Sequence, residues 1–137
     1  MKKYRFLDHT ADVKFQAFGA TLEEVFTNAA LAMASLMCKE KVSTRSSVRV
    51  DVEGRDLESL LYNFLEEFLV LFDSRNFLLA RVEAVEIDNR ELKLEAEAVG
   101  DRAGDYEIYM GIKAVTYSDM FVRQENNAWV AQVVLDV

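Results

Sequence analysis

Residues 57–72 read LESLLYNFLEEFLVLF, and the apolar side chains in this stretch recur every three or four positions. That spacing is typical of an α-helix with one apolar face. The apolar face consists of Leu57, Leu60, Leu61, Phe64, Leu65, Phe68, Leu69 and Phe72. Asp56, directly before the stretch, is a residue type that caps helix N-termini. So broad an apolar face predicts a helix that lies across a β-sheet and is well buried.

A second helix is predicted earlier in the chain, beginning after Thr21. Glu24 follows Thr21 by three residues, which is the spacing of a capping box. The apolar stripe of this helix consists of Leu22, Val25, Phe26, Ala29, Ala30, Met33 and Met37. Cys38 directly follows the stripe, so we expect it in the core or at the helix end.

Elsewhere the hydrophobic pattern has a period of two, which indicates β-strands. The predicted strands span residues 3–7, 13–19, 46–53, 77–87, 91–99, 106–117, 119–124 and 128–136. Such runs of strands around two helices predict an α+β fold, with two main helices packed on a mainly antiparallel sheet. We expect one domain over residues 1–137, in which strand 128–136 lies beside strand 13–19.

The charge balance narrows the choice of binding partners. The chain carries 24 Asp and Glu against 16 Lys and Arg, a net charge of −8. A domain that binds nucleic acid through its phosphates usually has a basic surface, so we expect no stable direct binding of nucleic acid. A cation or a basic patch on another protein is the better candidate.

Cysteine and histidine usage excludes two further classes of site. With one cysteine and one histidine, the chain can form neither an internal disulfide nor a Cys/His zinc site. The N-terminal residues lack the apolar run of a signal peptide, and no apolar stretch reaches the roughly 18 residues of a membrane helix. We therefore expect no membrane association and a cytoplasmic location.

The two ends of the chain carry the candidate functional residues. Residues 8–12 read DHTAD, and the chain closes on Asp136 and Val137. If the predicted strand 128–136 pairs with strand 13–19, Asp12, directly before strand 13–19, comes close to Asp136 at the end of the last strand. Carboxylates at that range repel each other, and a bound cation removes the conflict. Oxygen ligands suit Ca²⁺, Mg²⁺ or Mn²⁺ rather than Zn²⁺.

The same residues are also compatible with structural roles. Asp8 and Asp12 are common turn residues, and Asp136 is equally consistent with a solvated strand end. His9 has a side chain suited to general-base chemistry, but no Ser or Cys nucleophile lies near it in sequence, which favours a turn-stabilising role. Lys113 is either a solvated strand lysine or a cation that faces the acidic cluster or a phosphate.

Four segments resemble the archease family and occur in the family's order. They are YRFLDHTADVKFQAFGATLEEVFTNAALAM (4–33), LESLLYNFLEEFLVLFDS (57–74), IKAVTY (112–117) and WVAQVVLDV (129–137). The combination of DHTAD with a last strand that ends in Asp and a hydrophobic residue is fairly specific to that family.

The resemblance implies an accessory protein rather than an enzyme. Archeases promote multiple turnover of RtcB-type RNA ligases, which act in tRNA splicing and RNA repair, and they help to guanylylate the ligase's histidine from GTP. The family is also described with a metal site, usually calcium. Carried over to this chain, its ligands are Asp12, Asp136 and the main-chain or terminal oxygens of Val137.

The resemblance also suggests residues that contact or activate the partner. The family's functional lysine corresponds to Lys113, and Asp8 and His9 of the DHTAD segment are further candidates. One departure concerns Ser118, where the family often has a histidine, so any contribution of that histidine is missing or altered here.

Two other functions are compatible with the sequence. A small metal-dependent phosphohydrolase with DHTAD as its site would need an open metal position, a base and a substrate pocket. A general chaperone or protein-binding module for RNA-processing proteins would need a large exposed apolar patch.

Overall fold

The computed structural model describes residues 2–8 and 11–137. The elements in chain order are β1 (Tyr4–Leu7), β2 (Val13–Gly19), α1 (Leu22–Met37), β3 (Ser46–Glu53), α2 (Leu57–Arg75), β4 (Phe77–Asp88), β5 (Lys93–Arg102), a short 3₁₀ helix η1 (Ala103–Asp105), β6 (Ala114–Glu125) and β7 (Ala128–Asp136). The predicted α+β class, with two main helices and mainly antiparallel strands, is confirmed. Within the described residues, no helix is long and apolar enough to cross a membrane.

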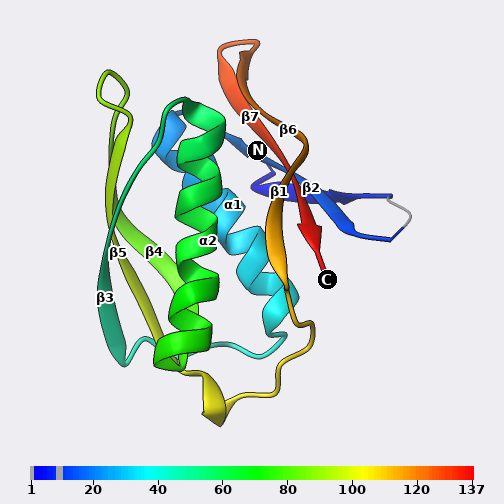
Figure 1. The fold of residues 1–137 in the computed structure, drawn as a ribbon, viewed down its shortest axis with the longest axis vertical. Helices are drawn as coiled ribbons and strands as arrows, with labels where there is room; N and C mark the ends of the chain where they lie inside the picture. The colour runs from blue at the N-terminus through cyan, green and yellow to red at the C-terminus, as the bar shows by residue number, and fades with distance from the viewer. Residues whose placement is uncertain (1, 9–10) are drawn as a thin grey trace.

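The strands form two antiparallel sheets with the helices between them (Figure 1). One sheet has four strands in the order β1-β2-β7-β6, and the other has three in the order β3-β5-β4. Helix α1 contacts β2 of the first sheet and β4 of the second, while α2 contacts β6, β3 and β4. The sequence pattern indicated strands packed on helices but not their division into two sheets.

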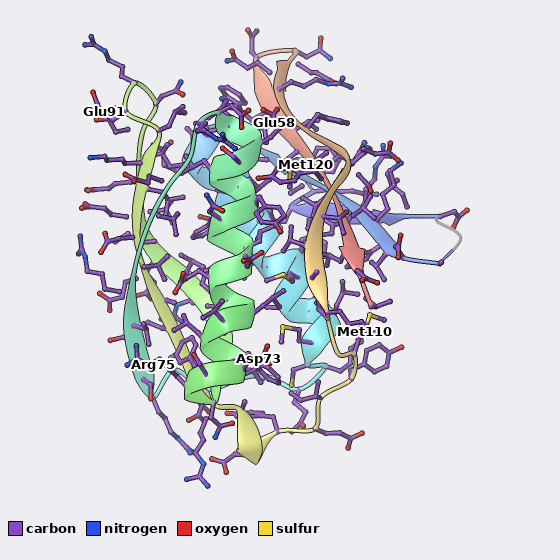
Figure 2. All side chains as sticks on the ribbon, in the orientation of Figure 1. Glu58, Asp73, Arg75, Glu91, Met110 and Met120 are labelled. Atoms are coloured by element: carbon purple, nitrogen blue, oxygen red, sulfur yellow. The ribbon has the colours of Figure 1, made fainter. Side chains whose placement is uncertain are left out.

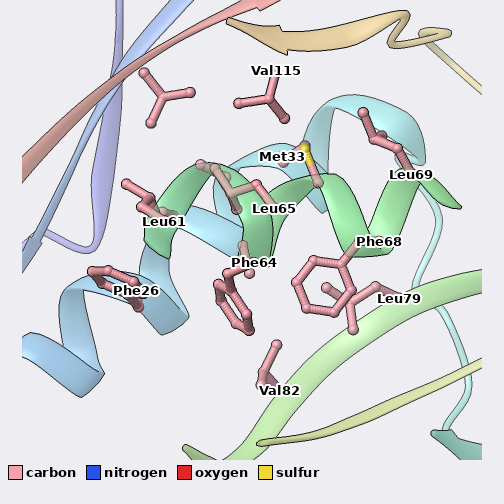
Figure 3. Packing of buried hydrophobic residues seen from close by; sticks show 14 of the residues in the cluster. Phe26, Met33, Leu61, Phe64, Leu65, Phe68, Leu69, Leu79, Val82 and Val115 are labelled. Atoms are coloured by element: carbon pink, nitrogen blue, oxygen red, sulfur yellow. The ribbon is translucent and has the colours of Figure 1, made fainter. Parts of the chain in front are cut away.

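The apolar face of α2 is buried from both sides, as Figure 3 shows. Leu65 points toward Val115 of β6, whereas Phe64 and Phe68 point toward Val82 of β4. Phe64 and Leu65 are fully buried, and the rings of Phe64 and Phe68 meet edge to face with centroids 5.0 Å apart. One helix therefore supplies core to both sheets, which explains why its apolar face is so broad.

The predicted helix starts are confirmed by their capping bonds. The Ser59 N–H donates to Asp56 Oδ1 at 2.7 Å and the Asp56 N–H donates to Ser59 Oγ at 3.1 Å, which is a reciprocal cap on α2. The Ser59 N–H bond lowers the pKa of Asp56. On α1, the Glu24 N–H donates to Thr21 Oγ1 at 3.1 Å.

A side chain of α2 also ties the helix to the four-stranded sheet. Glu58 lies at the start of α2, close to β6 (Figure 2). Its Oε2 accepts the main-chain N–H of Val122 at 3.0 Å. Because β6 is an edge strand of its sheet, this bond occupies a main-chain donor that would otherwise face outward.

The predicted pairing of the last strand with residues 13–19 is confirmed. The antiparallel register runs from Val13 opposite Leu135 to Gly19 opposite Trp129. The predicted bounds of strands 46–53 and 128–136 also match β3 and β7. Cys38 is buried and forms the C-cap of α1, as expected.

The prediction of a strand over residues 106–117 is wrong for its first half. Residues 107–113 form an extended segment outside both sheets, and the Tyr109 N–H donates to the Met37 carbonyl at the end of α1. Ile108, Met110 and Ile112 pack against the core, which produces the period-two pattern without a neighbouring strand. The predicted strand 119–124 is instead part of β6, which contains an irregularity after Thr116.

A buried carboxylate anchors the connection between α1 and β3. Asp101 at the end of β5 is 5% exposed and accepts the hydroxyl of Tyr106 at 2.6 Å. The same hydroxyl accepts the Ser43 N–H at 3.0 Å. The Tyr106 bond, the Arg102 N–H and the nearby Arg45 guanidinium lower the pKa of Asp101, so the carboxylate stays ionised.

Replacing Tyr106 with Phe is expected to lower the free energy of unfolding by about 1–3 kcal/mol at neutral pH, because the buried Asp101 carboxylate and the half-buried Ser43 N–H each lose a partner. Since the pKa of Asp101 is lowered on folding, its stabilising effect is present above its ordinary pKa of 3.8 and is lost as pH falls through the folded value. Urea unfolding of both proteins at neutral and strongly acidic pH measures the difference, which should shrink in acid. Tyr109→Phe, at an exposed tyrosine, is the control, and an equal loss in both variants would contradict this role for Asp101.

Candidate functional site

The ends of β2 and β7 bring two of the predicted metal ligands to one edge of the four-stranded sheet. Val13 lies opposite Leu135, and Asp12 and Asp136 are the next residues outward on each strand. Residues opposite each other in an antiparallel pair project from the same face. Asp12 and Asp136 are therefore cross-strand neighbours, and both are half-buried.

Lys113, the residue directly before β6, lies at the same edge. Its main-chain N–H donates to the carbonyl oxygen of Asp136 at 2.8 Å, and Ala114 pairs with Asp136 in the β6–β7 register. Lys113 is exposed, and Val137, which follows Asp136 in sequence, is half-buried. Asp12, Lys113, Asp136 and Val137 thus meet at what we call the acidic corner.

Asp8, the first residue of the DHTAD segment, directly follows β1. Leu7 pairs with Lys14, so Asp8 leaves β1 close to the acidic corner, and it is exposed. His9 lies outside the described residues 2–8 and 11–137, and its predicted role stays a prediction.

The donor atoms at the acidic corner restrict the kind of ion that fits. Within the described residues, no group of three or more His, Cys, Asp and Glu side chains is arranged to hold a metal. Asp12 and Asp136 supply two carboxylates, and Val137 can add main-chain or terminal oxygens. Ca²⁺ accepts carboxylate, carbonyl and water oxygens together, so these donors suit calcium far better than zinc.

A row of hydrogen-bonded polar side chains crosses the outer face of the same sheet. Buried Gln132 of β7 donates to the main-chain oxygen of Asp119 at 2.8 Å and accepts a bond from Gln16 of β2 at 2.9 Å. Gln16 in turn accepts a bond from Arg5 of β1 at 2.8 Å. The Lys14 ammonium group lies 3.3 Å from the Asp119 carboxylate. This row links all four strands just behind the acidic corner.

Sequence reasoning missed the polar row. Its one visible signal was Gln132, a polar residue in the otherwise apolar run AWVAQVVL. A buried glutamine in such a strand needs partners, because an unpaired amide in the core is costly. The partners belong to three other strands, so the sequence alone could not identify them.

The irregular part of β6 carries an exposed tyrosine that stacks on α2. The register with β7 shifts between Thr116 and Phe121. Within this bulge Tyr117 is 54% exposed and stacks on Tyr62 of α2, with ring centroids 4.3 Å apart. Ser118, the residue where the family often has a histidine, is exposed in the same bulge. Bulges of this kind often aim side chains at a functional surface.

Known proteins provide an independent comparison. The profile of the Archease protein family (MTH1598/TM1083) matches residues 4–137. A protein archease from Methanosarcina barkeri is 41% identical over 141 aligned positions, which cover 99% of this chain and 97% of that protein. A protein archease from Sulfurisphaera tokodaii is 36% identical, with all of both chains covered.

Solved structures agree in fold. The solution structure of Methanobacterium thermoautotrophicum protein 1598 is 36% identical, covers both chains completely and has a TM-score of 0.84. A Thermotoga maritima protein described as an archease and possible chaperone shares the fold, with a TM-score of 0.67 over 96% of this chain and 94% of its own. With a family profile that spans nearly the whole chain and relatives well above 30% identity, this protein belongs to the archease family.

Proposed function

We propose that this protein activates an RtcB-type RNA ligase by promoting GTP-dependent guanylylation of the ligase and so its multiple turnover. Membership of the archease family carries the proposal. The convergence of Asp12, Asp136 and Lys113 at one edge of a sheet supports it, since a metal-binding activator needs such a cluster.

We propose further that the oxygens of Asp12, Asp136 and Val137 hold a calcium ion or another hard divalent cation. The pairing of β2 with β7 supports this, because it makes Asp12 and Asp136 cross-strand neighbours whose carboxylate oxygens are the hard ligands that calcium prefers. The bound ion would supply positive charge at the tip of an otherwise acidic protein with net charge −8.

Positioning is the physical basis of the proposed activation. Transfer of a nucleotidyl group depends mainly on the alignment and electrostatic stabilisation of the phosphates and the nucleophile. An acidic surface steers toward a basic, phosphate-binding site on the ligase. There Lys113 is suited to contact a phosphate, and the exposed Tyr117 ring on the adjacent bulge is suited to anchor the protein contact.

A general chaperone role is a second candidate, suggested by the description of the Thermotoga maritima relative as a possible chaperone. Broad binding of unfolded chains needs a contiguous apolar patch. In the described part of the chain, the large exposed apolar residues are Phe6, Val70, Tyr109 and Tyr117. They belong to β1, α2, the 107–113 segment and β6, and this distribution favours a specific partner contact.

Ligation by an RtcB-type ligase with excess RNA tests the activation. The protein, added in catalytic amounts, is expected to convert single-turnover ligation to multiple turnover, and alone it is expected neither to ligate RNA nor to hydrolyse GTP. Lys113→Ala should reduce activation roughly tenfold, the effect of losing one charge-assisted contact, without changing the melting temperature. Lys93→Ala, at an exposed lysine of the other sheet, is the matched control.

Two results would count against the activation proposal, and a third would count against the role of Lys113. Unchanged turnover in the presence of the protein would refute it. Robust GTP or phosphoester hydrolysis by the pure protein would support a phosphohydrolase instead. If the Lys113→Ala and Lys93→Ala variants activate the ligase equally well, Lys113 is a solvated surface lysine with no role in activation.

Thermal unfolding with calcium and with chelator tests the metal. Calcium at about 100 times its dissociation constant should stabilise the protein by about 2.7 kcal/mol, because the ion binds the folded site. Asp12→Asn and Asp136→Asn should each lose most of this shift, whereas Asp73→Asn near the C-terminal end of α2 should retain it (Figure 2). The shift should diminish as pH falls, since protonated carboxylates are poor ligands.

An equal calcium-induced shift in all of these variants would refute the site at the acidic corner. If Asp12→Asn or Asp136→Asn loses the calcium-induced shift but still activates the ligase fully, the bound metal is not needed for activation.

A further inference from the structure

A groove beside the C-terminal half of α1 concentrates positive charge on this acidic protein. It has a volume of about 790 Å³ and is bounded by α1, the start of β1, residues 38–45 and β4. Its charged lining is Lys3, Lys41, Arg45 and Arg81 against the single acid Glu40. The whole chain, in contrast, carries a net charge of −8, so this surface is opposite in sign to the average.

Among the described residues that line the groove, Lys3 and Lys41 are the cations available to a ligand. Arg81 is paired with Glu83 at 2.7 Å, and Arg45 lies 3.7 Å from the buried Asp101 carboxylate. No carboxylate in the described residues 2–8 and 11–137 forms an ion pair with Lys3 or Lys41. Two unpaired ammonium groups facing one groove attract an anion of high charge density.

Glu40 is the one lining group that would repel such an anion. Its Oε1 accepts the main-chain N–H of Glu107 at 2.9 Å, so part of its charge is already engaged. A helix C-terminus also disfavours anions. At the end of α1, however, the carbonyls of Ala34 and Met37 accept the N–H groups of Cys38 and Tyr109.

The groove has an apolar side and a basic, polar side. Tyr4, Leu31, Ala34 and Leu79 give it an apolar side, while Ser43 and Thr44 add hydroxyls near the basic residues. Ligand pockets combine apolar walls with a few polar groups in this way, and their volumes are of similar size. The combination suits a ligand with an anionic head and an apolar body.

Residues 40–45, which form one wall of the groove, are fixed to the rest of the fold by hydrogen bonds. The Ser43 N–H is bound by the Tyr106 hydroxyl, which donates to buried Asp101 at 2.6 Å. Together with the bond between Glu40 and the Glu107 N–H, this fixes the 40–45 segment at two points. A fixed wall lowers the entropic cost of ordering Lys41 around a ligand.

The groove is separate from the acidic corner. Tyr4 lines the groove and pairs with Ala17, toward the end of β2 that leads into α1. Asp12 precedes Val13 at the opposite end of β2.

We propose that this groove binds a phosphate-bearing small molecule with an apolar or aromatic body, of the nucleoside monophosphate class. Lys3 and Lys41 bind the phosphate, assisted by the hydroxyls of Ser43 and Thr44, and the body packs on the apolar side against Tyr4 and Leu79. Charge-assisted hydrogen bonds of this kind are the strong contacts of phosphate recognition.

Isothermal titration calorimetry with adenosine monophosphate, adenosine and inorganic phosphate tests the proposal. Adenosine monophosphate should bind more tightly than either of the other probes, because only it carries both parts of the proposed ligand. The double variant K3Q/K41Q should weaken its binding roughly tenfold or more. The double variant K2Q/K39Q changes the neighbouring lysines on the same two segments, which do not line the groove, and should leave binding unchanged.

Two outcomes would overturn the assignment. Equal weakening in both double variants would show general attraction of phosphate to surface lysines rather than a site. Absence of adenosine monophosphate binding at millimolar concentrations, or binding no tighter than that of inorganic phosphate, would remove the phosphate-plus-body ligand. Thermal unfolding of both variants checks that each is folded, and neither lysine is buried.

Discussion

Burial of α2 between two sheets is the constraint on which the rest of this structure depends. Its apolar face is too broad for a single contact, and its fully buried residues reach β6 on one side and β4 on the other. Among the described residues, the outer faces of both sheets carry mostly polar and charged side chains, so the helices are the main apolar partner of each sheet. The two sheets can therefore exist as a pair only around this helix and its neighbour α1.

The inner faces of the sheets serve the core, which leaves the outer faces and strand ends for chemistry. In β2 and β7, Phe15 and Val133 point inward and are fully buried, while Gln16 and Gln132 on the alternate positions join the polar row. That row ties the four strands together on the side that the helices do not cover. The sheet that carries the acidic corner is thus supported by the helices on its inner face and by the polar row on its outer face. Such a rigid base suits a site whose geometry matters.

Charge is separated over the molecule rather than spread evenly. On the outer face of the three-stranded sheet, Asp51 lies opposite Glu95, an unfavourable cross-strand pair of like charges. Arg49 relieves it, at 3.3 Å from Asp51 and 3.1 Å from Glu95, and the pKa of Arg49 is raised mainly by its hydrogen bond to Asp51. Lys3 and Lys41, which form no ion pair with a described carboxylate, line a groove beside α1, so an acidic protein still has a surface that attracts anions.

The sequence by itself determined both helices, their caps and most strands, because periodicity and capping are local properties. It also indicated that β2 pairs with β7, and hence that Asp12 and Asp136 are neighbours. Only the tertiary structure decided that 107–113 is no strand, that Gln132 has partners on other strands, and that Lys3 and Lys41 share a groove. Those features depend on contacts between segments far apart in the chain, and no local pattern of residues records which distant segment will supply a hydrogen bond or a charge.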